Sequence, residues 1–354
     1  MKKIRVLVVE DSPVFRQYLE HIIAHDPRLE LVGTVETGEA ALQILEQVAP
    51  DVISMDIRLP GMNGFEATQK IMRQRPTPVV VISASLENAD LRITMNALQA
   101  GALTVLEKPA GVASNGYEAL AERLCTQLAI MSQVKVVGRR IETPVAPRFD
   151  NRFDDRPTVN ASGRRLLLGV ASSTGGPGAL VRLLGGLGSE FPSPILLVQH
   201  IAGGFLEGFA SWLGEVCPFP VEIVRNRSVL APGKIYLAAQ DHHLYAERGF
   251  VRAGRAEPVC AQRPSGTVLF ESIAAVYGSE AIGVVLTGMG DDGASGLLSV
   301  RRRGGHTIAE DESTAVVYGM PAEAVRLGAV SESLPLPSIA PRILELTGIR
   351  RKAA

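Results

Sequence analysis

The 354-residue sequence predicts two doubly wound α/β domains joined by a linker. In residues 1–125, short apolar runs of strand length alternate with amphipathic helical patterns, and the same alternation resumes after residue 164. Strands that alternate with helices form right-handed βαβ units around a parallel sheet. At roughly 150 residues per domain, the length also suggests two domains.

The first domain contains four apolar runs that predict buried strands, at residues 4–9, 51–55, 78–82 and 103–106. Two apolar stripes at helical spacing lie between the first two runs. Their members are Phe15, Leu19, Ile22 and Ile23, then Ala41, Leu42 and Leu45. A last helix is predicted from about Tyr117, with an apolar stripe of Leu120, Leu124 and Leu128.

The periodicity fails from Lys135 to Arg165. This segment holds three prolines and closely spaced charges of both signs, with few apolar residues to offset the entropy of ordering it. We therefore predict domains at residues 1–125 and 164–350, separated by a helix end and a linker at 126–163.

The second domain has apolar runs that predict buried strands at residues 166–171, 195–198 and 282–286. Shorter runs at 234–239 and 243–247 are also strand-like, and we expect some antiparallel hairpin. The predicted folds are a flavodoxin-like parallel sheet in the first domain and a Rossmann-like sheet with a hairpin in the second.

Composition excludes several classes of protein. Lys and Arg total 36 against 37 Asp and Glu, so the net charge of −1 gives no overall attraction to nucleic acid or anionic membranes. No apolar run approaches the ~18 residues of a membrane span. Cys125, Cys217 and Cys260 are too scattered for a disulfide framework. We expect a cytoplasmic protein that neither binds nucleic acid nor inserts into a membrane.

Polar side chains follow successive strands of the first domain. Glu10 and Asp11 come after the first strand and Asp56 after the next, followed by Ser83 and Lys108. Ligands bind beyond the carboxyl ends of the strands in such sheets. Carboxylates suit Mg²⁺, Asp56 could form an acyl phosphate as nucleophile, and Lys108 and Ser83 could hold the phosphoryl oxygens.

These strand ends resemble a response-regulator receiver domain, as do Met-Asp-Ile-Arg-Leu-Pro-Gly-Met-Asn-Gly at 55–64 and Glu-Lys-Pro at 107–109. The resemblance implies phosphorylation of Asp56 by a histidine kinase, with Mg²⁺ held by Glu10, Asp11 and Asp56. Val105 departs from the family, which usually has an aromatic switch residue three positions before the lysine.

The first strand of the second domain runs into a turn with the sequence small-x-Ser-x-Gly, which is typical of a nucleophile elbow. Only Ser173 has this spacing, because Val170 stands two positions before Ser172. A Gly-rich turn of this kind also suits a phosphate cradle. The Lys-Ser/Thr ending of a P-loop and the GxGxxG pattern are absent, however.

A serine nucleophile needs a base, and His200 directly follows the buried strand that ends at Gln199. A third buried strand, predicted at residues 282–286, leads to Asp291 and Asp292, either of which could orient the imidazole. The backbone N–H groups of that turn could also face an oxyanion. By contrast, His21 and His25 are better explained as part of a solvated helix face.

Five motifs together resemble the protein-glutamate methylesterase domain of bacterial chemotaxis. They are Ser-Thr-Gly-Gly at 173–176, Gln-His followed by Gly-Phe, Arg263-Pro264-Ser265, Gly-Met-Gly-x-Asp-Gly at 288–293 and Gly319-Met320-Pro321. The resemblance implies a triad of Ser173, His200 and Asp292 and an oxyanion contact at Met289, with Thr174 as support. Ala171-Ser172 and Ile201-Ala202 are mild departures from the family pattern.

The resemblance implies hydrolysis of glutamyl methyl esters on methyl-accepting chemotaxis receptors, activated by phosphorylation of Asp56. A chemotaxis histidine kinase would be the phosphodonor, and the ester chemistry needs no cofactor. Deamidation of receptor glutamines is left open. Two alternatives remain, a non-catalytic response regulator whose second domain binds a partner and a nucleotide-binding output domain.

Overall fold

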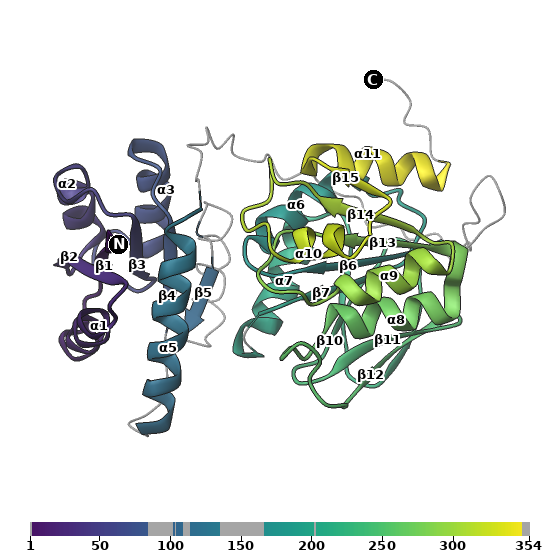
Figure 1. Ribbon diagram of the computed structural model, residues 1–354, viewed down its shortest axis with the longest axis horizontal. Helices are drawn as coiled ribbons and strands as arrows, with labels where there is room; N and C mark the ends of the chain where they lie inside the picture. The colour runs from purple at the N-terminus through teal and green to yellow at the C-terminus, as the bar shows by residue number, and fades with distance from the viewer. Residues whose placement is uncertain are drawn as a thin grey trace. The chain divides into compact units, whose positions relative to one another are not determined.

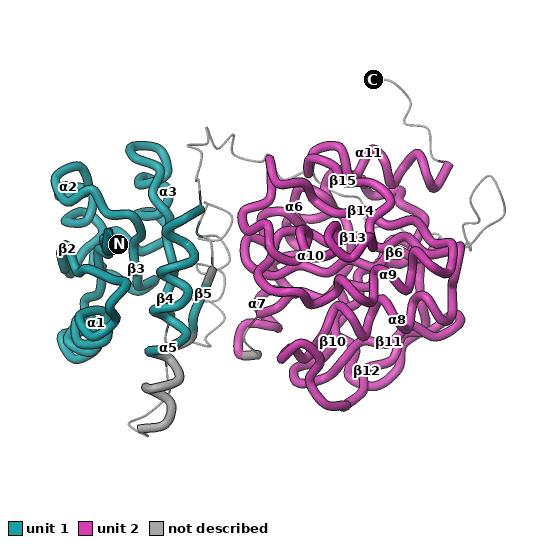
Figure 2. Tube along the Cα trace, viewed as in Figure 1, with its two compact units in different colours: residues 1–143 teal, residues 144–354 magenta. Residues whose placement is uncertain are grey.

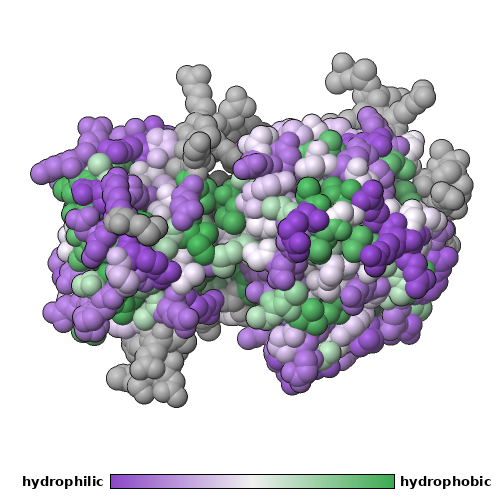
Figure 3. Space-filling model, in the orientation of Figure 1, coloured by the Kyte–Doolittle hydropathy of each residue, from purple (hydrophilic) through white to green (hydrophobic). Residues whose placement is uncertain are grey.

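The computed structural model describes residues 2–83, 102, 104–108, 114–134, 166–201 and 203–348 (Figure 1). Its internal contacts divide the chain into two compact units, residues 1–143 and 144–354 (Figure 2), and each is described by itself. Residues 135–163 of the predicted linker lie outside the described residues. On the faces visible in Figure 3, apolar side chains form small areas among polar ones.

Unit 1 contains a five-stranded sheet in the order β2-β1-β3-β4-β5, and every pair of neighbours is parallel. This is the predicted flavodoxin-like order. The strands are β1 (Ile4–Val9), β2 (Leu29–Val35), β3 (Val52–Asp56), β4 (Val79–Ser83) and β5 (Thr104–Glu107). The described helices are α1 (Pro13–His25), α2 (Gly38–Val48), α3 (Gly64–Gln74) and α5 (Ser114–Met131).

Strand β2 carries no continuous apolar run and was not expected from the sequence. It lies at the edge of the sheet, and of its residues only Leu29 is fully buried. In contrast, every residue of β3 and β4 is buried, as their apolar runs predict for central strands. The predicted stripe on α1 is confirmed, since Phe15, Leu19, Ile22 and Ile23 are its buried residues.

Unit 2 centres on a seven-stranded parallel sheet in the order β15-β14-β13-β6-β7-β10-β8. The strands are β6 (Leu167–Ser172), β7 (Ile195–Gln199), β8 (Val221–Val224), β10 (Ile235–Ala238), β13 (Ala281–Val285), β14 (His306–Glu310) and β15 (Glu332–Leu334). The chain leaves β6 on one side through β7 and returns on its other side with β13. The strand order therefore reverses at β6, and such a switch point is where ligands bind in open α/β sheets.

The expected antiparallel element is a second, three-stranded sheet. It pairs β11 (His243–Glu247) with β12 (Phe250–Gly254), and β12 with β9 (Arg227–Val229). The strand-like run at 234–239 is β10, which belongs to the main sheet.

Helices cover both faces of the main sheet, with α6 and α11 on one face and α8 and α9 on the other (Figure 1). The helices are α6 (Gly176–Leu187), α7 (Leu206–Val216), α8 (Gly266–Tyr277), α9 (Ala294–Arg302), α10 (Met320–Arg326) and α11 (Leu336–Thr347). Gly186 lets α6 approach α11, because a Cβ there would lie 2.6 Å from Ala340 Cβ. No helix within the described ranges is long and apolar enough to cross a membrane.

Candidate active site

The turn between β6 and α6 holds Ser173 at the carboxyl end of the main sheet. Strand β6 ends at Ser172 and α6 begins at Gly176. Between them Gly175 has a φ of 78°, and a Cβ there would lie 2.6 Å from Val316 Cβ. A side chain at position 175 would therefore be strained and would clash, so the sharp turn requires glycine. Ser173 is partly exposed in this turn.

The buried side chain of Gln199 ties the serine turn to the histidine. Its Oε1 accepts a 2.7 Å hydrogen bond from Ser172 Oγ. Its Nε2 donates to the carbonyl oxygens of Ser173 at 2.8 Å and of His200 at 2.9 Å. The two serines therefore differ, because Ser172 is fully buried and hydrogen-bonded whereas Ser173 is partly exposed in the turn.

His200 and Asp292 form a buried pair, with 2.8 Å between His200 Nε2 and Asp292 Oδ2. The carboxylate also accepts hydrogen bonds from Ser265 Oγ at 2.5 Å, Gly266 N at 2.6 Å and Thr267 N at 3.1 Å. The last two are the first N–H groups of α8, which favour a negative charge. Burial raises the pKa of Asp292, but the hydrogen bonds from His200, Ser265 and Gly266 outweigh burial and hold the pKa below its ordinary value.

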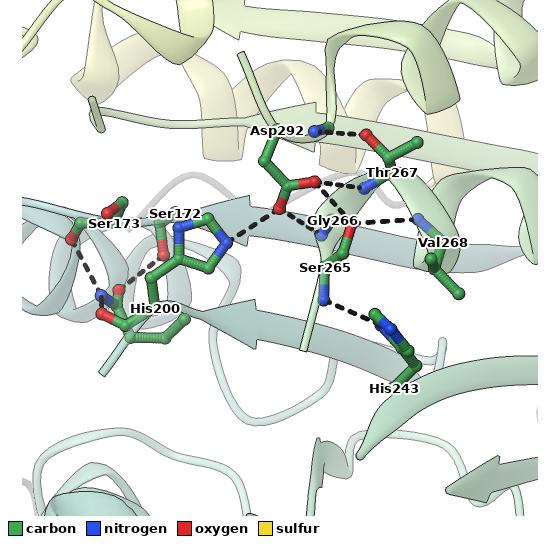
Figure 4. Close-up of polar contacts among 11 residues, drawn as sticks. Ser172, Ser173, His200, His243, Ser265, Gly266, Thr267, Val268 and Asp292 are labelled. Atoms are coloured by element: carbon green, nitrogen blue, oxygen red, sulfur yellow. Dashed lines mark hydrogen bonds and ion pairs between the residues drawn. The ribbon is translucent and has the colours of Figure 1, made fainter. Parts of the chain in front are cut away.

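The imidazole of His200 lies between Asp292 and the two serines in the view of Figure 4. Because Nε2 donates to the ionised Asp292, the lone pair of Nδ1 is the basic site of the ring. Within the described residues, no hydrogen bond joins His200 to the Ser173 hydroxyl. Catalytic hydrogen bonds are often long before substrate binds, so this geometry is compatible with general-base catalysis.

The backbone N–H groups of Thr174 and Met289 donate to no acceptor among the described residues. These are the residues predicted to support an oxyanion. Gly288 brings the two segments together, since a Cβ there would lie only 2.8 Å from Ser173 Cβ. Met289 is 39% exposed, so its side of the turn is accessible to a substrate.

Thr287 connects these two segments through both its backbone and its hydroxyl. Its carbonyl oxygen accepts from Ser173 N at 3.0 Å, and its Oγ1 donates to Thr174 O at 2.9 Å. Its own N–H donates to Glu310 Oε2 at 2.9 Å. Glu310 is 1% exposed at the end of β14, and burial raises its pKa, opposed by the hydrogen bond from Thr287. Glu310 and Thr287 therefore fix the position of the turn that contains Thr174 relative to the turn that contains Met289.

Four other candidates lie outside this group, namely His21, His25, His306 and Asp291, whereas the buried His243 adjoins it because His243 Nδ1 accepts a 3.2 Å hydrogen bond from Ser265 N. His21 and His25 are on α1 of unit 1, with ring centroids 4.1 Å apart. His306 begins β14 and so lies at the opposite end of a strand whose carboxyl end carries Glu310. Asp291 is exposed, whereas Asp292 is 2% exposed.

A second polar site lies at the strand ends of unit 1. Lys108 Nζ lies 2.8 Å from Glu10 Oε2 and 2.9 Å from Asp56 Oδ2. Oxygen atoms of Glu10, Asp11 and Asp56 lie within 4.8 Å of one another, and Asp11 is exposed. The predicted strand-end residues thus converge, and their oxygens form a cluster suited to Mg²⁺.

The charges of this cluster fit a divalent cation and a phosphoryl group. Burial raises the pKa of Glu10 to about 7, with Asp56 adding to the effect and Lys108 opposing it. Burial also raises the pKa of Asp56. One lysine therefore does not fully compensate the two buried carboxylates. Ser83 Oγ is buried and lacks a hydrogen-bond partner within the described residues, so it is available to an incoming phosphoryl oxygen.

The two units match two known families. Residues 168–343 match the CheB methylesterase family, and residues 6–115 match the response regulator receiver domain. A protein-glutamate methylesterase/protein-glutamine glutaminase of Paramagnetospirillum magneticum is 52% identical over 348 residues, which cover 98% of each chain. The chain belongs to the protein-glutamate methylesterase family.

Another family member of the same name, from Nitrosospira multiformis, is 42% identical over 348 residues, again covering 98% of each chain. The crystal structure of the Thermotoga maritima CheB methylesterase catalytic domain is 34% identical in sequence. The match covers 51% of this chain and 98% of the Thermotoga maritima chain, with a TM-score of 0.49.

Four residues that hold the site of this methylesterase family member were not assigned a role from the sequence. They are Gln199, Ser265, Thr287 and Glu310. Gln199 and Glu310 are buried polar residues at the ends of apolar strands, which is the one signal that points to them. Thr287 carries the same signal, because it directly follows the apolar run 282–286 and is buried. Ser265 follows no apolar strand, so its contact with Asp292 depends on which strands and helices are neighbours.

Proposed function

We propose that this chain is a phosphorylation-regulated protein-glutamate methylesterase whose nucleophile is Ser173. We assign residues 1–125 to the receiver domain, 126–163 to the helix end and linker, and 164–350 to the catalytic domain. The observation that carries the proposal is the buried His200–Asp292 pair beside the serine turn, in a family member whose receiver pocket contains Asp56 and Lys108.

Ester hydrolysis proceeds in two halves. Ser173 Oγ attacks the carbonyl carbon of the glutamyl methyl ester while His200 Nδ1 accepts the hydroxyl proton. The N–H groups of Thr174 and Met289 stabilise the resulting oxyanion. The C–OCH₃ bond then breaks, and His200 returns the proton to the departing methanol, leaving an acyl-serine.

Water completes the reaction by the same route. His200 takes a proton from the water as it attacks the acyl carbon, and the proton then passes to Ser173 Oγ as the acyl bond breaks. A glutamine side chain would follow the same path with ammonia as the leaving group. Asp292 stabilises the imidazolium in each half, and no step needs a cofactor.

The receiver would control this activity. A carboxylate oxygen of Asp56 attacks the phosphorus of a phosphohistidine in a chemotaxis histidine kinase, and the P–N bond breaks as the acyl phosphate forms. Lys108 and Ser83 hold the phosphoryl oxygens. When bound by Glu10, Asp11 and Asp56, Mg²⁺ supplies charge neutralisation for this transfer.

We further propose that methyl-accepting chemotaxis receptors are the substrates and that the chain acts in the cytoplasm. Cys125 and Cys217 are buried free thiols, which fits a reducing compartment. The test is methanol release from methylated receptor with and without a small-molecule phosphodonor and Mg²⁺. The proposal predicts faster release when Asp56 is phosphorylated. An unchanged rate with Asp56 fully phosphorylated would contradict the regulatory part.

A further inference from the structure

A cavity of about 540 Å³ opens beside the catalytic residues, at the carboxyl ends of β7 and β10. Gln199 lines it, and the same side chain binds the carbonyl oxygens of Ser173 and His200. Ile201, which also lines it, directly follows His200 in the chain. The cavity thus borders the serine turn, yet none of the hydrolytic steps above uses it.

The lining of the cavity divides into an apolar floor and a polar rim. The floor side chains are nearly fully buried and include Leu197, Leu206, Phe209 and Leu237. The rim carries Gln240, Asp241, Arg255 and Arg263. A cavity of several hundred Å³ that combines apolar side chains with polar groups at its mouth is a common form of ligand site.

The two arginines of the rim have different roles. Arg263 is committed to the protein, because its Nε donates to Asp241 Oδ1 at 2.7 Å and another nitrogen donates to Ala256 O at 2.8 Å. Arg255 is 70% exposed, and its nearest carboxylate, Asp241, is 4.0 Å away. Since Asp241 is already neutralised by Arg263, Arg255 leaves an excess positive charge at the mouth.

The loops that form this rim are held in an uncommon backbone conformation. Asp241, Cys260 and Ala261 have φ values of 59°, 50° and 57°, in the left-handed region that favours glycine. Non-glycine residues keep such a conformation only where the surrounding contacts impose it, and these residues concentrate at ligand sites. For Asp241 the contact is the ion pair with Arg263.

We propose that this cavity is a substrate-recognition subsite. It takes an apolar side chain of the polypeptide that carries the reacting glutamyl ester, while Arg255 pairs with a carboxylate on the same segment. The methyl ester itself is uncharged, so it gains nothing from a cation at the rim. Arg255 would instead favour substrates that carry an acidic residue near the ester. This inference rests on the proposed function.

The test uses the full chain and a set of glutamyl methyl ester peptides that differ only by one Glu or Gln at each position within five residues of the ester. The wild type should show a lower KM for at least one Glu peptide than for its Gln partner. Arg255→Gln should raise the KM for that Glu peptide by about 1.5-fold to fivefold, the range of an exposed ion pair, and leave kcat and the Gln peptide unchanged. Arg255→Glu should reverse the preference.

The matched control is Arg248→Gln, since Arg248 is 67% exposed in the β11–β12 turn and pairs with Glu280. It should behave as the wild type. The subsite proposal would be overturned by equal KM values for every Glu and Gln pair of peptides. It would also be overturned if the Arg255→Glu variant kept the preference for a Glu peptide. In either case, methanol release would still support the proposed esterase activity. If the wild type releases no methanol from methylated receptor or from any peptide, both proposals fail together.

Discussion

Nε2 of His200 lies 2.8 Å from Oδ2 of Asp292, and the side chains of the two residues are only 9% and 2% exposed. Three further donors, from Ser265, Gly266 and Thr267, reach the same carboxylate. The N-terminus of α8 therefore keeps Asp292 ionised inside the protein, and Asp292 in turn fixes the imidazole of His200. The orientation of His200 therefore depends on a helix that contributes no catalytic residue of its own.

Ser265→Ala removes one donor to Asp292 and should lower kcat/KM about tenfold, since charge-assisted hydrogen bonds are worth roughly 1.5–3 kcal/mol. Loss of this hydrogen bond raises the pKa of Asp292, so the loss of activity should deepen at the acid end of the pH–rate profile, where Asp292 begins to take up a proton. The measurement is kcat/KM across pH. Ser272→Ala is the control, because Ser272 lies in α8, the helix that Ser265 precedes, but bonds to Ala246 N and Leu269 O. A profile identical to the wild type would refute this role.

Thr287→Val keeps the shape of the side chain but removes the hydroxyl that bridges Thr174 O and Val317 N. The two oxyanion donors should then lose alignment, and kcat should fall about tenfold or more, below the 10²–10³ lost when a donor is deleted outright. Thr287→Ser keeps the hydroxyl and should retain most of the activity. The account of the oxyanion turn is wrong if the two variants have the same kcat.

Glu310→Gln tests the buried carboxyl group through protein stability. Burial raises the folded-state pKa of Glu310 above the ordinary value of 4.5, so the folded state binds more protons than the unfolded state in the window above pH 4.5. The wild type should therefore lose stability relative to Glu310→Gln as pH rises through that window. Trp212, the single tryptophan, is buried in unit 2 and reports its unfolding. A difference between the two proteins that is independent of pH would contradict the prediction.

Ser83→Ala should slow phosphorylation of Asp56 by a small-molecule phosphodonor without destabilising unit 1, because Ser83 Oγ makes no hydrogen bond in the described structure. Removing an unsatisfied buried hydroxyl costs no hydrogen bond. Thr68→Val provides the contrast, since Thr68 Oγ1 donates to Gly64 O at 2.7 Å. This variant should lose about 1 kcal/mol of stability and keep its phosphorylation rate. A Ser83→Ala variant that is phosphorylated at the wild-type rate would contradict the proposed role of Ser83 in binding the phosphoryl group.

The fold was predictable for most strands that are buried on both faces, although β14, which is also largely buried, was not predicted. The apolar runs of β3, β4 and β7 predict them directly, because both faces of a central parallel strand pack against helices. Strand β2 escaped prediction because most of its residues are partly exposed. The same reason applies to β15, a short edge strand with no buried residue.

The site was predictable in its strand-end residues but not in its supports. Ser173 and His200 follow apolar strands, so their position in the chain indicates a shared edge. Asp291 and Asp292 are neighbours that strand position alone cannot separate. The family motif points to Asp292, and in the folded unit Asp292 is buried whereas Asp291 is exposed. Glu310 supports the site because β14 pairs with β13. The order of strands in the sheet cannot be read from the sequence pattern, so this contact was not predictable.

The most direct test of the central claim is methanol release from methylated receptor by Ser173→Ala and Ser172→Ala. Ser173→Ala should lose at least about 10³-fold in rate, because the nucleophile is gone. It should still be phosphorylated at Asp56. Ser172→Ala should keep measurable esterase activity, since its hydroxyl only bonds to Gln199. Methanol release by Ser173→Ala at the wild-type rate, with loss in Ser172→Ala, would contradict the assignment of the nucleophile.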